Sequence, residues 1–382
     1  MGLLGLMMTS IKAEAQNTVN EKLSFLTAPY LQNPRPDAMT VMWVTSKNCY
    51  SWVEFGEKEA LSEKANMKLY GLVQANNRIN KIKLEHLKPD TRYFYKVLSR
   101  DIISFAPYKV VYGDTIQSRV YTFTTPATSP GEVSLLIMND LHDRPASIPY
   151  LLGLNGSNPY DFVFFNGDIL SYLNGESQII SSLIQPAAGA FASEKPFMYV
   201  RGNHETRGAY ARNFYDYVDN DGGYYSFSRG PAYFIVLDTG EDKPDESVEY
   251  SGLVAFDGYR EKQALWLEEQ LKSEACMQAK FRVVLMHMPH YHSGNWHGVM
   301  HCRQLFGPLL NKYKVDISIS GHTHQYGIYE PVKGEHNFPM IIGGGPKDGA
   351  RTLIRLNIKE DLLNVSMLND AGTEVGKYEI KK

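Results

Sequence analysis

The segment Asp161-Phe-Val-Phe-Phe-Asn-Gly-Asp168 contains the pattern that decides how most of this chain folds. Residues 162–165 are all apolar, which is typical of a β-strand buried on both faces of a sheet. The run ends at a Gly-Asp pair, so a carboxylate lies directly beyond the carboxyl end of the predicted strand. In open α/β sheets, ligands bind beyond that end of the strands. The segment therefore predicts an α/β domain with a polar site at one edge of its sheet.

Five other apolar runs in the C-terminal part of the chain have the same continuous character. Helical stretches lie between them, such as residues 259–273, where Ala264, Leu267 and Leu271 share one face. Strands that alternate with helices predict a layered α/β domain, and the chain is expected to end in a β meander. The six predicted buried strands are 133–138, 162–165, 197–200, 233–237, 282–286 and 315–319, and the meander strands are 352–358, 362–367 and 377–380.

Five of the six buried strands are followed at once by a short polar motif. Since the strand ends should meet at one surface, the motif side chains are expected to converge there. Glycines at positions 167, 202 and 321 suit the tight turns that such a surface requires. Asp238, which follows the remaining strand, has no assigned role. In chain order the motifs are Asp140-Leu-His142, Gly167-Asp168, Gly202-Asn203-His204-Glu205, His287 and Gly321-His322-Thr323-His324.

These motifs supply the side chains that a pair of metal ions needs. They contain two carboxylates, one amide oxygen and four ligand-type imidazoles, and one imidazole is left over for acid–base work. Asp168 is the candidate for a carboxylate that bridges both ions. Mixed oxygen and imidazole ligands suit Fe, Mn or Zn better than Mg or Ca, and the absence of thiolates argues against a structural zinc site. Two adjacent metal ions are suited to hydrolysing phosphate esters.

Residues 24–126 follow a different pattern, in which apolar and polar positions alternate in short runs separated by turn residues. This alternation predicts an all-β domain, and about 100 residues with roughly seven strands suit a β-sandwich. Trp43, in the early run 39–44, is the expected core aromatic. Tyr93 follows the turn that begins at Leu87 and resembles the tyrosine corner of such sandwiches. The segment looks like a fibronectin type III-like domain.

The remaining segments complete the expected domain plan. Ala13-Glu-Ala15 has the small-x-small form of a signal-peptidase site, so we interpret residues 1–15 as the remnant of a signal peptide. This interpretation favours a secreted or periplasmic protein, and a disordered tail is the alternative. Residues 127–131 are rich in turn and breaker residues and form the predicted linker. The α/β domain is then expected to occupy residues 132–382.

Composition excludes several functional classes. The 382 residues are 43% hydrophobic and 21% charged, with 39 basic against 42 acidic residues and a net charge of −3. No basic cluster stands out, which argues against electrostatically driven nucleic-acid binding. No stretch approaches the ~20 apolar residues of a membrane span. The three cysteines argue against a disulfide-built scaffold by their odd number, although a single Cys276–Cys302 bridge stays open. The sequence makes no prediction of oligomeric state.

The ordered motifs resemble the calcineurin-like metallophosphoesterases, whose pattern is D-x-H, G-D, G-N-H-[DE], H and G-H-x-H. The match spans residues 133–326, and Ala28-Pro-Tyr-Leu-Gln32 narrows it to the purple acid phosphatase-like branch, in which a fibronectin-like domain precedes the catalytic domain. The resemblance implies that His204 is a non-ligand histidine that orients phosphate or protonates the leaving group. It also implies one metal ion held by Asp140, His142, Asp168 and His324, and a second held by Asp168, Asn203, His287 and His322.

Two positions depart from that branch. Purple acid phosphatases carry an iron-binding Tyr three residues after the Gly-Asp aspartate, where this chain has Ser171, and Tyr172 falls one place late. They also generally carry Gly where this chain has His142. The Fe(III)–tyrosinate chromophore of the branch is therefore not carried over. The expected cofactor is two metal ions, with Fe, Mn and Zn left open.

Two further residues are candidates for contacts with substrate. His297 lies ten residues after His287, about where the plant-type enzymes place a phosphate-contacting histidine. Arg144 follows the first motif and could add positive charge for a monoester dianion, whereas Arg144 and Arg207 could equally be solvated or ion-paired. His297 has the alternative of an ordinary surface histidine.

The expected function is hydrolysis of a small phosphorylated substrate. The resemblance implies in-line attack of a metal-bound hydroxide on a phosphate monoester, with His204 and His297 as candidate acids for the departing alkoxide. The first alternative is a phosphodiesterase or nucleotide hydrolase that uses the same metal site. A remote alternative is a non-catalytic surface binding protein whose β-sandwich carries the function.

Overall fold

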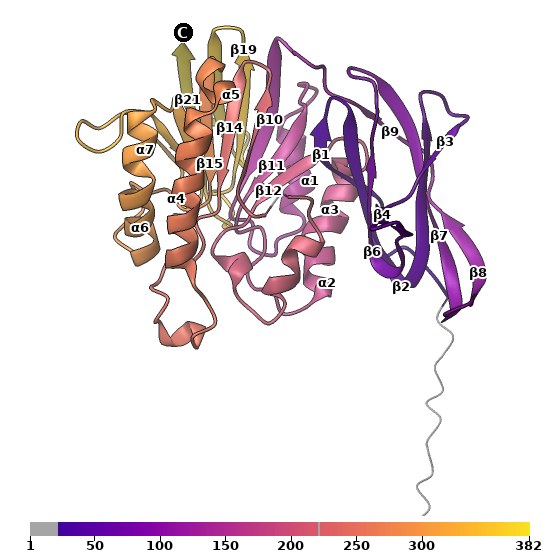
Figure 1. The fold of residues 1–382 in the computed structure, drawn as a ribbon. Helices are drawn as coiled ribbons and strands as arrows, with labels where there is room; N and C mark the ends of the chain where they lie inside the picture. Colours follow the sequence, from indigo (N-terminus) through magenta and orange to yellow (C-terminus); the bar gives the residue numbers. More distant parts are fainter. Residues whose placement is uncertain (1–21, 221) are drawn as a thin grey trace, which may run out of the picture.

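The computed structural model describes residues 22–220 and 222–382, in which two domains pack side by side (Figure 1). The N-terminal domain consists of strands, and the C-terminal domain consists of strands covered by helices. The proposed signal-peptide remnant at 1–15 lies outside the described residues. None of the helices within the described ranges is long and apolar enough to cross a membrane. The predicted fold class, an all-β domain followed by a layered α/β domain, is confirmed.

The N-terminal domain is a β-sandwich in which one long strand belongs to both layers. The first half of β2 pairs with β1 and β6, and its second half pairs with β7. The runs 39–44 and 52–55, which read as separate strands in the sequence, are therefore parts of one strand. The strands are β1 (Tyr30–Arg35), β2 (Ala38–Gly56), β3 (Glu63–Ala65), β4 (Lys68–Leu69), β5 (Leu72–Val73), β6 (Ala75–Leu84), β7 (Arg92–Ala106), β8 (Lys109–Gln117) and β9 (Tyr121–Thr124).

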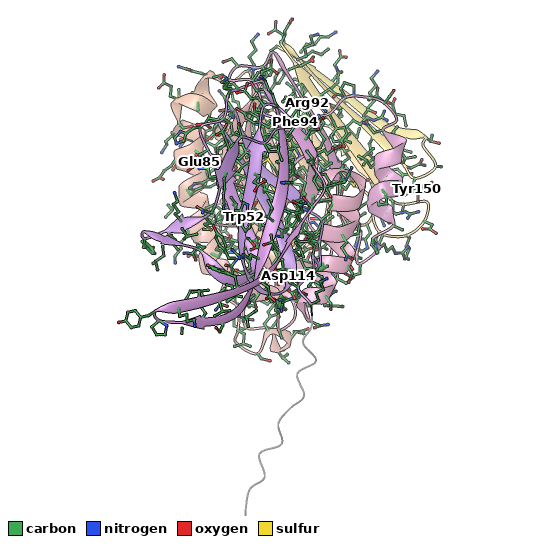
Figure 2. The ribbon with its side chains drawn as sticks, turned by 90° about the vertical axis from the view of Figure 1, so that its right-hand side faces the viewer. Trp52, Glu85, Arg92, Phe94, Asp114 and Tyr150 are labelled. Carbon is green, nitrogen blue, oxygen red and sulfur yellow. The ribbon has the colours of Figure 1, made fainter. Side chains whose placement is uncertain are left out.

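The core of this domain contains both aromatic residues that the sequence pointed to. Trp43 is fully buried, and its indole N–H donates a hydrogen bond to Ser99 Oγ at 3.0 Å. The hydroxyl of Tyr93 accepts the backbone N–H of Lys88 at 2.9 Å, which is the hydrogen bond of a tyrosine corner. Trp52 and Phe94 lie instead on the outer face that is turned to the viewer in Figure 2.

The C-terminal domain packs two β-sheets face to face. Side chains from both sheets share one core, which includes Leu135, Phe234 and Ile354. All six predicted buried strands and the meander are present. The first sheet contains β10 (Glu132–Met138), β11 (Phe162–Asn166), β12 (Phe197–Val200), β19 (Thr352–Lys359), β20 (Leu362–Asn369) and β21 (Glu374–Lys381). The second contains β13 (Tyr225–Arg229), β14 (Ala232–Leu237), β15 (Phe281–Met286), β16 (Ile317–Ser320), β17 (Gly327–Tyr329) and β18 (Met340–Ile342).

Helices cover the outer faces of both sheets (Figure 1). Leu267 of α4 and Cys302 of α6 pack against the second sheet, and Leu151 of α1 packs against the first. All three cysteines are buried and unbridged, so the Cys276–Cys302 bridge is absent. The helices are α1 (Ser147–Leu154), α2 (Glu176–Ile179), α3 (Gln185–Ala187), α4 (Phe256–Lys272), α5 (Glu274–Gln278), α6 (His297–Leu305) and α7 (Gly307–Lys312), with π-helical turns at Ile180–Ile184 and Ala188–Ala192.

A hydrogen-bonded sheet, and not a linker alone, joins the two domains. Strand β1 pairs in parallel with β12, with Gln32 opposite Phe197, so the first sheet continues into the sandwich. The Tyr30 ring stacks on that of Phe197 at 5.9 Å, and its hydroxyl donates to the carbonyl of Tyr217 at 2.9 Å. Because β12 also leads into one of the polar motifs, the sandwich helps to fix the position of that motif.

Candidate metal centre

The polar motifs lie at the carboxyl ends of parallel strands. Strands β10, β11 and β12 run parallel in the first sheet, and β15 and β16 run parallel in the second. Each ends one or two residues before its motif, so both sheets deliver side chains to one edge of the domain. The fourth run, β14, ends before Asp238, which is buried and accepts hydrogen bonds from Arg201, Tyr215 and Tyr259. Asp238 therefore has a structural role.

The backbone at this edge is held in an uncommon conformation. Five of the motif residues have left-handed backbones although none is glycine, which costs roughly 1–2 kcal/mol per residue. Such residues persist where the surrounding structure over-determines them, and they cluster at functional sites. Their φ angles are 52° at Asp140, 48° at His142, 54° at Asp168, 73° at His322 and 58° at His324.

Glycines allow the loops to approach one another. A Cβ atom on Gly167, whose φ is 81°, would lie 2.5 Å from His287 Nδ1. A Cβ on Gly321 would overlap the Asp140 carboxylate. Glycine at these two positions is therefore required by the close packing of the candidate ligands.

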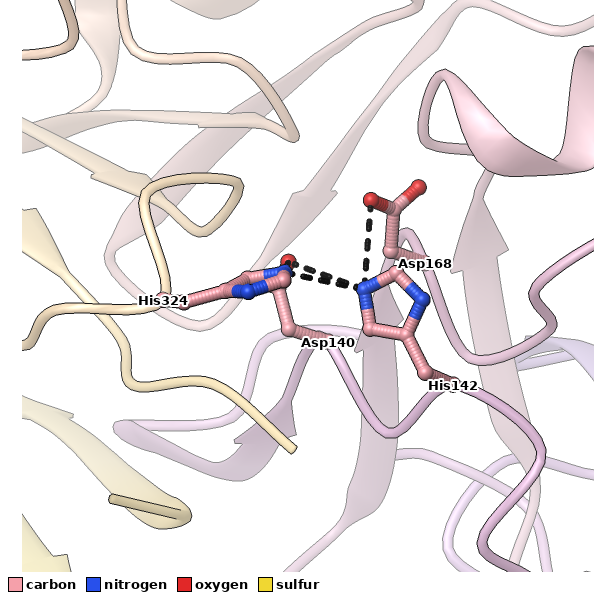
Figure 3. Close-up of side chains that lie close together, drawn as sticks. All are labelled: Asp140, His142, Asp168 and His324. Carbon is pink, nitrogen blue, oxygen red and sulfur yellow. Dashed lines mark hydrogen bonds and ion pairs between the residues drawn. The ribbon is translucent and has the colours of Figure 1, made fainter. Parts of the chain in front are cut away.

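The first group of candidate ligands contains two carboxylates and two imidazoles, which point toward one another in Figure 3. His142 Nε2 lies 3.0 Å from His324 Nε2 and 3.7 Å from Asp168 Oδ2. Asp140 Oδ1 lies 3.3 Å from His324 Nε2 and 3.8 Å from His142 Nε2. These four side chains each offer one ligand atom within 4.8 Å of the others, as a single metal ion requires.

The second group shares Asp168 with the first. His287 Nε2 lies 3.0 Å from Asp168 Oδ2, the oxygen that also faces His142. His322 belongs to the same group, and its Nδ1 lies 3.1 Å from Asn203 Oδ1. A carboxylate placed between two ligand groups has the position that a bridging ligand needs. The structure therefore brings together all seven residues that the sequence suggested as metal ligands.

Neighbouring groups orient the ligand atoms. His287 Nδ1–H donates to the carbonyl of Asn166 at 2.9 Å, which leaves Nε2 facing Asp168. Asp140 Oδ2 accepts hydrogen bonds from Asn139 Nδ2 at 2.6 Å and from the backbone N–H of His322 at 2.8 Å. Outer partners of this kind fix the tautomer and direction of metal ligands.

Two observations show that the centre fits metal cations. Asp140 Oδ1 and His287 Nε2 are buried without a hydrogen-bond partner, and each points into a ligand group. Burial alone would raise the pKa of Asp140, but the surrounding imidazoles, His287 foremost, hold it well below its ordinary value. Burial likewise opposes the cationic form of His287, but Asp168 and Asp140 raise its pKa to about 10. The two buried carboxylates of the site therefore favour positive charge beside them.

Glu205 holds two of the motif loops together, a role that the sequence did not reveal. Its fully buried carboxylate accepts the backbone N–H groups of Asp168, Leu170 and Gly202 at 2.7–2.9 Å. It also accepts the hydroxyl of Tyr199 at 2.7 Å. The acidic residue at the end of the Gly-Asn-His-Glu motif was the available signal, but the two backbone groups that it ties to this motif, those of Asp168 and Leu170, lie 37 and 35 positions away.

His204 lies beside the first group without belonging to it. Its ring is 4.5 Å from that of His142, and its backbone N–H donates to Asp168 Oδ1 at 2.9 Å. Its Nδ1–H donates to the carbonyl of Ser171 at 2.9 Å, and its Nε2 accepts from Arg207 Nη1 at 3.2 Å. Burial and the Arg207 cation lower the pKa of His204 despite the opposing effect of Asp168.

Arg207 is held rigidly beside His204. Its Nε and Nη2 contact the two oxygens of Glu241 at 2.7 and 2.9 Å, a two-point contact that fixes the plane of the guanidinium. Glu241 is 1% exposed and also accepts hydrogen bonds from Thr206 and Tyr250. The sequence left Arg207 as solvated or ion-paired. It is ion-paired, and the pair places it at the metal centre.

The two residues that the sequence suggested for substrate contacts, His297 and Arg144, are engaged elsewhere. His297 Nε2 lies 2.8 and 2.9 Å from the carboxylate oxygens of Asp257, and Arg144 Nη1 lies 3.6 Å from Asp348 on an exposed loop. Neither contacts the seven candidate ligands within the described residues. Tyr172 is half exposed, with its ring 5.6 Å from that of His204. It takes no place among the candidate ligands.

Comparisons with known proteins agree with this arrangement. The calcineurin-like phosphoesterase family matches residues 133–326, just over half of the chain, and the purple acid phosphatase N-terminal domain family matches residues 28–125. A probable purple acid phosphatase of Arabidopsis thaliana is 25% identical over 352 residues, covering 84% of this chain and 74% of the relative. Acid phosphatase type 7 of Mus musculus is 26% identical, covering 81% and 70%.

A solved structure shares the fold of both domains. The purple acid phosphatase from yellow lupin (Lupinus luteus) seeds superposes with a TM-score of 0.67 at 19% identity. The superposition covers 92% of this chain and 74% of the lupin chain. The structural likeness therefore extends over both domains of this chain.

Proposed function

This chain belongs to the calcineurin-like phosphoesterase family, and we propose that it is a metal-dependent phosphatase that hydrolyses phosphate monoesters. The observation that carries this proposal is the pair of ligand groups that share Asp168. One metal ion would be held by Asp140, His142, Asp168 and His324, and the other by Asp168, Asn203, His287 and His322. When bound, two such ions supply Lewis acidity at the phosphoryl group and an acidified water molecule.

The protein's own contribution is to orient the substrate beside the metal ions. Because Nδ1–H of His204 already donates to Ser171, Nε2 is the atom that would face substrate; in the imidazolium form, Nε2–H would donate to a phosphate oxygen or to the leaving-group oxygen. Arg207 Nη1, which donates to Nε2 of the neutral ring, would then turn to the same phosphate. We propose that Arg207 supplies the positive charge for which Arg144 was the candidate, and makes the phosphate contact for which His297 was the candidate.

Charge beside the metal ions favours a monoester over a diester. A monoester dianion carries one more negative charge at phosphorus than a diester, and a fixed guanidinium discriminates in its favour. A phosphodiesterase or nucleotide hydrolase remains the first alternative because it would use the same metal ligands. The non-catalytic alternative requires lost ligands, whereas seven suitable side chains converge here.

Several finer assignments belong to the same proposal. The tyrosine-corner hydrogen bond and the two-layer core support a fibronectin type III-like domain at 24–126, joined by a linker at 127–131 to a catalytic domain at 132–382. The parallel β1–β12 pairing supports a scaffold role for that domain. The proposed export to the periplasm or the exterior rests on the signal-like sequence at 1–15. The two metal ions are proposed to be Fe, Mn or Zn.

The proposal is tested by metal exchange. The protein is stripped with a chelator and reloaded separately with Mn, Zn or Fe. Initial rates are then compared on p-nitrophenyl phosphate and bis(p-nitrophenyl) phosphate. We expect activity that depends on metal and favours the monoester. Preference for the diester would move the function to the first alternative. Inactivity on both substrates with two metals bound would support the non-catalytic one.

A further inference from the structure

A third group of metal-ligand side chains lies outside the dinuclear centre. Asp257 is in the first turn of α4, and His297 and His301 are one turn apart on α6. Residues four apart on a helix project from the same face, so both imidazoles can approach one ion. Their rings lie 5.8 Å apart, and both face Asp257.

The distances within this group are close to those around a bound ion. Asp257 Oδ1 lies 2.8 Å from His297 Nε2 and 3.0 Å from His301 Nδ1, and Oδ2 lies 2.9 Å from His297 Nε2. Ligand atoms about 2.0–2.1 Å from a tetrahedral zinc ion lie roughly 3.3 Å apart. Each imidazole would have to move by only a few tenths of an ångström from the carboxylate to admit the ion between them.

Arg260 supports the carboxylate from the buried side. Its guanidinium is fully buried, donates to Asp257 Oδ1 at 2.9 Å, and is anchored to the carbonyl of Thr239 at 2.9 Å. Asp257 Oδ2 is left to face His297. Carboxylate ligands of metal ions are themselves held by hydrogen bonds from an outer shell, and Arg260 has that position.

We propose that Asp257, His297 and His301 bind a third divalent transition-metal ion, with zinc as the best fit. Two imidazoles and one carboxylate form a three-ligand set that suits zinc and leaves a coordination position for water. The three side chains are 32%, 38% and 14% exposed, so solvent can deliver the ion. Magnesium and calcium prefer all-oxygen sites and are excluded by the two imidazoles.

A metal ion at this site would fix the position of α6 relative to α4, beside the dinuclear centre. The backbone N–H of Gly298, next to His297, donates to the carbonyl of Asp242 at 2.8 Å. Asp242 Oδ1 in turn lies 3.4 Å from Arg207 Nη2. An ion that joins the first turns of α4 and α6 would therefore hold the segment that flanks Arg207.

The test counts zinc in the full-length chain and does not depend on activity. Chelator-treated protein is dialysed against zinc, and bound metal is measured by elemental analysis. We expect about three zinc ions per chain in the natural protein and about two in His301→Gln. The control variant is His86→Asn, which removes an exposed histidine. His86 has a left-handed backbone, which Asn tolerates, so this variant should fold normally and keep about three zinc ions per chain.

Two further variants make the result decisive. Asp168→Asn should empty the dinuclear centre and keep the third ion, so failure of one site is distinguished from failure of the other. His292→Gln tests the neighbouring pair in which His292 Nε2 lies 2.8 Å from His336 Nε2. The proposal is overturned if the natural protein binds two ions, or if the third ion survives His301→Gln and is lost in His292→Gln.

Discussion

The dinuclear centre and the group on α4 and α6 use similar side chains but are built in opposite ways. In the dinuclear centre, Asp140, Asp168 and His287 are at most 1% exposed and lie at strand ends, where Asp140 and Asp168 have left-handed backbones. Asp257 and His297 are about one-third exposed and are carried by helices. The first arrangement leaves buried polar atoms without partners, whereas Asp257 already accepts hydrogen bonds from two imidazoles and one guanidinium.

The two regions therefore differ in how far their stability depends on a bound metal ion. Burying carboxylates without a counter-charge costs several kcal/mol per ion, so the strand-end centre depends on cations to offset that cost. In the helix group, the Arg260 guanidinium balances the charge of Asp257 without any metal. We therefore expect the dinuclear centre to lose both function and stability when its ligands change. The helix group should change only its metal content and a small part of the stability.

The largest effect is expected for Asp168→Asn. Removing the charge of the shared carboxylate should abolish metal binding in both ligand groups, since Asp168 belongs to each. Turnover on p-nitrophenyl phosphate should fall by more than about 10³-fold, because the electrostatic contribution of both ions is lost. Asp114→Asn, an exposed carboxyl on β8 (Figure 2), serves as the matched control. Full activity in Asp168→Asn would contradict the bridging position.

His204→Ala should separate chemistry from metal binding. His204 contacts the centre through its backbone N–H and is not a ligand, so metal content should stay unchanged. Turnover should fall by about 10²–10⁴-fold if the imidazole orients phosphate or transfers a proton. Metal analysis and kcat are measured on the same preparation. Release of metal from this variant would mean that the imidazole belongs to the ligand set.

Glu205→Gln should damage the strand-end centre through its framework. An amide group would place N–H groups opposite backbone N–H donors, so buried donors would lose their acceptor. The expected loss in the free energy of unfolding is about 2–4 kcal/mol, together with weaker metal binding. Urea denaturation with chelator present isolates the structural part. Glu85→Gln, at an exposed pair with Lys83, should cost less than about 1 kcal/mol.

Arg207→Lys tests the residue that lies between the two regions. Lysine keeps the charge, but it cannot make the two-point contact with Glu241 that aims the guanidinium. The KM for p-nitrophenyl phosphate should rise about 10-fold, and the preference over the diester should shrink, while metal content is unchanged. Arg92→Lys, an exposed arginine on β7 (Figure 2), provides the control. An unaltered substrate preference would remove Arg207 from the substrate site.

The sequence predicted the strand-end region far better than the helix group, for a physical reason. A continuous apolar run followed by Asp168 or His287 places the side chain as soon as the strand is recognised, because strand ends share one sheet edge. His297 lies ten residues beyond His287, but its direction depends on how α6 docks against α4. The pairing of Arg207 with Glu241 joins positions 34 apart and leaves no local pattern. The continuity of β2 through both layers was likewise hidden, since its middle reads as a turn.

The smallest effect is expected for His301→Gln in the presence of chelator. The imidazole is mostly buried, but its one hydrogen bond goes to a carboxylate that keeps His297 and Arg260 as partners. The free energy of unfolding should therefore fall by less than about 1 kcal/mol. Added zinc should stabilise the natural protein more than the variant, because an ion that binds the folded state alone adds RT ln(1 + [Zn]/Kd) at each site. Equal zinc stabilisation of both proteins would show that the helix group is satisfied by its own hydrogen bonds and has no use for a metal.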